Sequence, residues 1–138
     1  MLALLDTDVI LDLVLDRTPF VAAAEALVEA HEQGRFSAYI APITPVNVFY
    51  IVRKNKGAEI AREAITAIID GFYVCPLDLT VLQSATVLPL TDFEDAVQLA
   101  AALASGLDAI VTRNIVDYAG APLPVYRPDE FLKLIPHP

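Results

Sequence analysis

The chain has 138 residues, of which 56% are hydrophobic and 20% charged, and this composition suits one folded domain rather than a disordered segment. Its formal net charge of −9 argues against non-specific binding of duplex nucleic acid through a basic surface, but does not exclude a nucleic-acid substrate. No apolar run reaches the roughly 18 residues that span a membrane, and aspartates interrupt the N-terminal segment, so we expect no membrane anchor or signal peptide. The single cysteine, Cys75, cannot form an internal disulfide, and we expect a cytoplasmic protein.

Apolar runs and helical patterns alternate along the chain. We expect strands at residues 2–5, 36–41, 72–77 and 109–112, with a short fifth strand at 124–126. Helices are expected at 9–15, 19–32, 46–54, 57–69, 79–87 and 91–104, with a final helical turn at 129–132. This alternation indicates an α/β protein: a three-layer α/β/α sandwich with a mainly parallel central sheet of four to five strands. Residues 1–138 are expected to form a single domain, because no repeat or linker divides them.

Capping residues predict where several helices begin. Thr18 is expected to cap the second helix, and Pro45 to occupy the first position of the third. Asp78 is a candidate cap for the helix at 79–87. Thr91 and Glu94 have the spacing of a capping box, which places the start of the next helix at Thr91.

Four aspartates lie beside the predicted strands and helices in a way that points to a metal site. Asp6 ends the first strand, Asp92 and Asp95 open an apolar helix, and Asp117 lies beyond the strand at 109–112. Ligand sites in open α/β sheets form beyond the carboxyl ends of the strands. Carboxylates gathered there repel one another unless a cation neutralises them, and oxygen ligands suit Mg²⁺ or Mn²⁺. We therefore expect Asp6, Asp95, Asp117 and Asp92 to bind one of these ions.

Ordinary structural roles compete for some of these acids. Asp6 could cap the helix that follows it, and Asp92 could interact with a helix dipole. Asp95 has a weaker structural explanation, because the helix it opens is apolar almost all round and therefore buried. Asp8 and Asp12 are like charges one helical turn apart, so we expect them to face solvent or to cap, with Asp8 as a weaker site candidate.

Neutral polar residues lie near the same expected edge of the sheet. Thr112 and Asn114 follow the last central strand, where they could complete a ligand set or orient a water molecule, or could belong to an ordinary loop. Arg113, between them, could contact a phosphate or pair with an aspartate. Asn47 is a neutral oxygen ligand candidate early in the helix at 46–54, or simply part of its polar face.

Four basic residues, Arg53, Lys54, Lys56 and Arg62, are close together in sequence. They could form a local basic edge for a phosphate backbone. The simpler interpretation is a solvated helix end, where cations are favoured by the helix dipole.

Four short motifs, taken in order, resemble those of the PIN domain, particularly its VapC-like bacterial branch. They are LLDTDVILD at 4–12, TPVNVFYIVRK at 44–54, DFEDA at 92–96, and IVTRN at 110–114 followed by Asp117 and Tyr118. The resemblance extends over essentially the whole chain. It implies a Mg²⁺- or Mn²⁺-dependent endoribonuclease, often the toxin of a toxin–antitoxin pair with a small antitoxin protein as partner, and often a homodimer.

The resemblance also assigns residues. Asp6 and Asp95 match the central metal-binding acids of the family. Asn47 stands where many relatives carry Glu, and Asn114 where many carry Asp, so Asp117 or Asp92 would have to supply the missing charge. Fewer carboxylates weaken the affinity for a hard cation.

The implied mechanism is hydrolysis of an RNA phosphodiester bond by metal-activated water. Asp6, Asp95 and Asp117 would hold one or two ions, which lower the pKa of a bound water and stabilise the charge on the phosphate. Thr112 or Asn47 could position that water.

Two alternatives remain at this stage. The first is a haloacid-dehalogenase-like phosphatase with Asp6 as nucleophile, which is disfavoured because no lysine precedes the later acid pair. The second is a catalytically silent PIN-like module that binds RNA or a protein, which the asparagines at 47 and 114 would suit.

Overall fold

The computed structural model describes residues 1–138, and at its centre is a sheet of five strands that all run parallel. The spatial order of the strands is β3-β2-β1-β4-β5. In chain order they are β1 (Leu2–Leu5), β2 (Ser37–Ile40), β3 (Tyr73–Val74), β4 (Ala109–Val111) and β5 (Val125–Tyr126). The expected parallel sheet, including the short fifth strand, is therefore confirmed.

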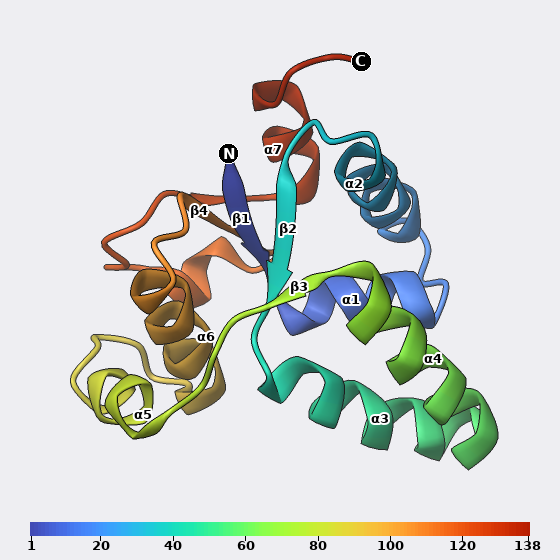
Figure 1. The fold of residues 1–138 in the computed structure, drawn as a ribbon, viewed down its shortest axis with the longest axis horizontal. Coiled ribbons are helices and arrows are strands. Elements are labelled where there is room, and N and C mark those ends of the chain that lie inside the picture. The colour runs from blue at the N-terminus through green and yellow to red at the C-terminus, as the bar shows by residue number, and fades with distance from the viewer.

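Helices cover both faces of the sheet (Figure 1). They are α1 (Thr7–Val14), α2 (Val21–Glu32), α3 (Ile43–Lys56), α4 (Ala58–Gly71), α5 (Leu79–Thr86), α6 (Phe93–Ala104) and α7 (Pro128–Leu134), with a 3-10 turn, η1, at Ile115–Tyr118. The pair α5 and α6 lies on one side of the sheet, and α1 to α4 lie on the other. No helix is both long enough and apolar enough to cross a bilayer.

The alternation of side chains along β1 shows why both faces must be covered. Ala3 and Leu5 pack into the core beneath α1 to α4, and Leu4 packs into the core beneath α5 and α6. All three residues are buried. Apolar residues on both faces are typical of parallel strands, so the short run at the start of the chain accounts for the expected three-layer α/β/α sandwich.

Helix α6 begins later than the capping box predicted. Asp92, rather than Thr91, is the N-cap, and its Oδ1 accepts a hydrogen bond from the backbone N of Asp95 at 3.0 Å. Asp and Thr are both good N-caps, so the sequence alone could not choose between neighbouring positions. The predicted cap at Asp78 is confirmed, because its Oδ1 accepts from the N of Val81 at 3.0 Å.

Two other helix starts also differ from the expectation. Helix α3 begins at Ile43, so Pro45 lies within its first turn, where the missing N–H costs no helical hydrogen bond. Helix α2 begins at Val21 with Phe20 as its N-cap, not at Pro19 with Thr18 as its cap, and the N of Val21 bonds to the carbonyl of Arg17 at 2.7 Å in a turn that precedes the helix.

Strand β1 lies at the centre of the sheet, and the chain adds strands first on one side of it and then on the other. From β1 it moves outward to β2 and β3, and it then returns to the other side of β1 to form β4 and β5. The register pairs Leu5 with Val111, and the N of Asp6 donates to the carbonyl of Val111 at 2.9 Å. The residues that follow β1 and β4 therefore meet at a topological switch point, where α/β proteins place their ligands.

Candidate active site

A cleft of about 530 Å³ opens at the carboxyl ends of β1 and β4. Six of its 12 lining residues are acidic and none is basic. The sequence-predicted residues among them are Asp6, Asn47, Asp92, Asp95, Asn114 and Asp117; the others are Thr7, Asp8, Leu11, Tyr50, Ile51 and Glu94. The fold thus brings six of the seven predicted site residues to one cleft, and the seventh, Thr112, is bonded to Asp6 beneath it.

Asp6 is the most enclosed acid of the cleft, with 6% of its surface exposed. Its Oδ2 accepts a hydrogen bond from the Thr112 hydroxyl at 2.7 Å, and its Oδ1 accepts one from Gln98 Nε2 at 2.9 Å. Burial raises the pKa of Asp6 above its ordinary value, although these hydrogen bonds oppose the shift. Asp6 has only neutral donors as partners, so its negative charge is not compensated.

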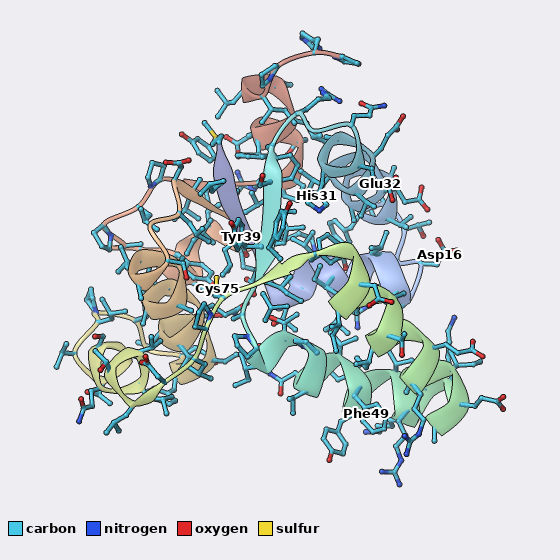
Figure 2. The ribbon with its side chains drawn as sticks, in the orientation of Figure 1. Asp16, His31, Glu32, Tyr39, Phe49 and Cys75 are labelled. Atoms are coloured by element: carbon cyan, nitrogen blue, oxygen red, sulfur yellow. The ribbon has the colours of Figure 1, made fainter.

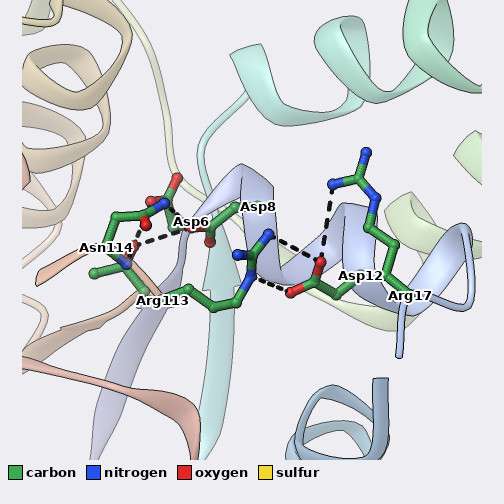
Figure 3. Close-up of polar contacts among 7 residues, drawn as sticks. Asp6, Asp8, Asp12, Arg17, Arg113 and Asn114 are labelled. Carbon is green, nitrogen blue, oxygen red and sulfur yellow. Dashed lines mark hydrogen bonds and ion pairs between the residues drawn. The ribbon is translucent and has the colours of Figure 1, made fainter. Parts of the chain in front are cut away.

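Asp8 also faces the cleft. Its Oδ2 accepts from Asn114 Nδ2 at 2.9 Å, and its buried Oδ1 has no hydrogen-bond partner (Figure 3). Burial, followed by the negative charge of Asp6, raises the pKa of Asp8 to about 7. The expectation that Asp8 faces solvent or caps a helix is wrong, because the turn from β1 into α1 directs this side chain towards the loop after β4.

Asp95, in the first turn of α6, also lines the cleft. Burial is the largest cause that raises its pKa to about 7, and the charges of Asp6, Asp92 and Asp117 add to the effect. The Tyr118 hydroxyl donates to its Oδ1 at 3.4 Å. Asp92 and Asp117 are exposed at the rim, where Asp92 also caps α6.

Asp12 differs from the other acids of this region because it is buried against cations. Arg113 Nε lies 2.6 Å from Asp12 Oδ2, and Arg17 Nη1 lies 3.8 Å from Asp12 Oδ1 (Figure 3). The Arg113 guanidinium also stacks 4.0 Å above the centre of the Phe20 ring. The expectation that Asp12 faces solvent is wrong. Of the two roles considered for Arg113, the structure shows the pairing with an aspartate.

Sequence reasoning missed Gln98 and Tyr118. Gln98 is fully buried in α6, and its amide contacts both Asp6 and the Tyr118 hydroxyl. The one available signal was its position as a lone polar residue in an otherwise apolar helix. A polar side chain buried there must be hydrogen-bonded.

His31, which is half-buried, and Cys75, which is buried, both lie outside the cleft (Figure 2). His31 Nε2 donates to the carbonyl of Gly71 at 2.9 Å, and its Nδ1 accepts from the N of Ala38 at 3.1 Å. Cys75 is buried in the core beside α5 and α6. Neither residue lines the acidic cleft, so the site contains no histidine base and no thiol nucleophile.

The donor set of the cleft suits a hard divalent cation. Its polar side chains offer carboxylate, amide and hydroxyl oxygens and no histidine nitrogen or cysteine sulfur, and one buried carboxylate oxygen lacks a partner. As the side chains lie, however, no three His, Cys, Asp or Glu residues converge closely enough to hold one ion. Joint coordination therefore requires at least one of these side chains to change its rotamer.

The family model described as PIN domain matches residues 3–116. The chain therefore belongs to the PIN domain family, as the motif resemblance predicted. No curated protein is similar enough in sequence to count as a relative.

Solved structures of VapBC and other toxin–antitoxin complexes share the fold. A toxin–antitoxin complex from Klebsiella pneumoniae contains a chain with 26% identity and a TM-score of 0.68, and the match covers 91% of this chain and 97% of that one. DNA-bound VapBC from Salmonella typhimurium gives a TM-score of 0.73 at 16% identity, covering 93% and 99%. VapC20 from Mycobacterium tuberculosis, described as a sarcin–ricin loop cleaving toxin, gives 0.64 at 14% identity, covering 78% and 86%.

Proposed function

We propose that this chain is a divalent-metal-dependent endoribonuclease, a single domain over residues 1–138, that serves as the toxin of a toxin–antitoxin pair. The observation that carries the proposal is the acidic cleft, where Asp6, Asp8 and Asp95 are gathered without a cationic side chain among the lining residues. Family membership and the resemblance to toxin–antitoxin chains support the same conclusion. They also favour the nuclease over the haloacid-dehalogenase-like phosphatase.

The proposed ligands of the Mg²⁺ or Mn²⁺ ion are Asp6 and Asp95, with Asp117, Asp92 and Asn114 at the rim. To these we add Asp8, because its unpartnered Oδ1 lies in the same cleft. When bound, such an ion supplies a water of lowered pKa and stabilises charge on the phosphate.

The neutral residues predicted for the site have two roles in this proposal: to fix a metal ligand and to contact the substrate. Thr112 holds Asp6 through its hydroxyl, which fixes one carboxylate before the substrate arrives. Asn47 presents a neutral amide to the cleft, and an amide N–H can donate to a phosphate oxygen, which a carboxylate cannot do. Neutral residues at 47 and 114 also lower the repulsion that a polyanionic RNA meets at an acidic cleft.

A silent module that binds RNA or a protein is the second candidate. It is favoured by the Asn114 amide, which directs a donor rather than an oxygen ligand at Asp8. It is also favoured by the lack of three convergent acids.

Titration of Mn²⁺ into metal-free protein separates the two candidates. We expect the wild type to bind Mn²⁺ and to cleave RNA, and Asp95→Asn to lose both while remaining folded. Asp70→Asn is the matched control, because Asp70 is an exposed acid outside the cleft. No Mn²⁺ binding by the wild type, with or without RNA, would establish the silent module instead.

The proposed partners are an RNA substrate, a small antitoxin protein and a second copy of the chain. We expect expression of the wild type to arrest growth of a bacterial host, and Asp95→Asn to be harmless at the same protein level. Light scattering of the purified protein tests the homodimer.

A further inference from the structure

The amide of Gln98 uses all of its hydrogen-bonding capacity within the protein. Its Oε1 accepts from the backbone N of Thr7 at 3.1 Å and from the Thr7 hydroxyl at 3.3 Å. Its Nε2 donates to Asp6 Oδ1 at 2.9 Å and to the Tyr118 hydroxyl at 3.2 Å. A primary amide has two donors and two acceptor positions, so all four are occupied. A flipped amide would direct its donors at the Thr7 N–H and its oxygen at a carboxylate, so the partners determine its orientation.

The Tyr118 hydroxyl continues this chain of hydrogen bonds to Asp95, which also lines the cleft. It accepts from Gln98, and its own proton is donated to Asp95 Oδ1 at 3.4 Å. Tyr118 is buried, with 2% of its surface exposed, and its ring packs in the core beside α6. Burial and the nearby carboxylates raise the pKa of Tyr118, so the phenol keeps the proton that it donates.

These bonds connect two carboxylates that would otherwise repel each other. Asp6 follows β1 and Asp95 lies on α6, so the two side chains come from elements far apart in sequence. The link uses Oδ1 of each carboxylate. Each carboxylate oxygen has a further lone pair, and Asp95 Oδ2 is bonded to no other side chain, so both acids keep acceptor capacity for a cation.

We propose that Gln98 and Tyr118 are positioning residues that restrain the carboxylates of Asp6 and Asp95 at the cleft and so favour the binding of a divalent cation. This inference rests on the proposed metal site. The competing explanation is that Gln98 and Tyr118 are a satisfied polar pair that stabilises the core. The two explanations differ in what happens when only the link to Asp95 is removed.

Tyr118→Phe removes one hydroxyl and keeps the buried ring. We expect the Mn²⁺ dissociation constant to rise about tenfold or more, the range typical of losing a partner that orients a metal ligand. We also expect RNA cleavage to recover when the Mn²⁺ concentration is raised well above the new dissociation constant. The matched control is Tyr39→Phe, because Tyr39 on β2 (Figure 2) also packs against the core beside α6 but takes no part in the hydrogen bonds that connect Asp6 and Asp95. A purely structural role would lower the melting temperature of the metal-free protein without changing metal affinity.

Gln98→Met is the second variant, because it removes every hydrogen bond of Gln98, including those to Asp6 and Tyr118, at nearly constant side-chain volume. If it folds, we expect it to bind Mn²⁺ more weakly than Tyr118→Phe. Wild-type affinity in Tyr118→Phe would overturn the inference and leave the proposed nuclease intact. A wild type that binds no Mn²⁺ would overturn both, so the two failures are distinguishable.

Discussion

Two buried aspartates near the start of the chain, Asp6 and Asp12, show how differently one fold treats a carboxylate. Asp12 is 1% exposed and lies against Arg113 and Arg17. Asp6 is 6% exposed, and its side chain accepts hydrogen bonds only from Thr112 and Gln98. Burial of a charge is costly unless it is paired. The negative charge of Asp12 is therefore neutralised by arginines of the protein itself. The charges of Asp6 and of the acids beside it are not, so they are available to a bound cation.

The two aspartates are nevertheless coupled through one loop. Thr112, Arg113 and Asn114 are consecutive, and they contact Asp6, Asp12 and Asp8 respectively. Asp12, through its ion pair with Arg113, anchors this loop, and the loop in turn orients Asp6 and Asp8. We therefore expect loss of the ion pair of Asp12 mainly to lower the stability of the fold. Loss of a carboxylate in the cleft should mainly reduce metal binding and activity.

Arg113→Met is expected to have the largest effect on stability, because it leaves Asp12 buried with only the longer contact to Arg17. Breaking a buried ion pair from one side typically costs about 3–5 kcal/mol, measured here as the free energy of unfolding in urea. Arg127→Met is the control, because the Arg127–Glu130 pair is half-exposed and should contribute little. The double variant Asp12→Leu with Arg113→Met should recover much of the loss. A small effect of Arg113→Met alone would show that Asp12 is not the structural anchor.

The pH dependence of stability tests the unpaired acids. An unfolded Asp releases its proton near pH 3.8, whereas the pKa values of Asp8 and Asp95 in the folded protein are about 7. Between these values the folded state binds more protons, so this stabilisation is complete below pH 3.8 and is lost as the pH rises through about 7. After allowance for solvent screening, we expect the free energy of unfolding of the metal-free protein, measured with a chelator present, to fall by about 2 kcal/mol over this interval.

Two variations sharpen this test. Asp95→Asn should flatten the pH dependence, because the asparagine does not titrate. Excess Mn²⁺ should oppose the loss at higher pH, because the ion binds the deprotonated carboxylates. A metal-free protein whose stability rises steadily from pH 4 to 8 would contradict the assignment of uncompensated charge to the cleft.

The smallest expected effect comes from the two aspartates that cap helices. Asp92→Ala and Asp78→Ala each remove an N-cap bond of 3.0 Å, from α6 and α5 respectively, and each should cost about 1 kcal/mol. Only Asp92 lines the cleft. If it also binds the ion, Asp92→Ala alone should weaken Mn²⁺ affinity. Equal affinities in the two variants would limit Asp92 to its capping role.

The sequence allowed a correct prediction of the sheet, and six of the seven residues predicted for the site lie in one cleft, because strands and the residues that end them follow local patterns. Short apolar runs such as Leu2–Leu5 and Ala109–Val111 place apolar side chains on both faces of a strand, so both faces must be covered by helices. Polar residues directly after them must then meet at one edge of the sheet. The helix starts were less predictable, since Thr91 and Asp92 are both good caps and the choice depends on how α6 packs.

What the sequence by itself determined was the parallel α/β fold and the presence of Asp6, Asp92, Asp95 and Asp117 near its switch point, because periodicity and strand ends are properties of neighbouring residues. Only the tertiary structure decided which aspartates are charge-compensated. Asp8 and Asp12 follow the same local pattern, yet Arg113, far along the chain, pairs with one and leaves the other facing the cleft. Likewise, only the packing of α6 against β1 brings Gln98 within hydrogen-bonding distance of Asp6, and Tyr118 then connects Gln98 to Asp95. Charge compensation depends on contacts between distant segments, and no local pattern encodes them.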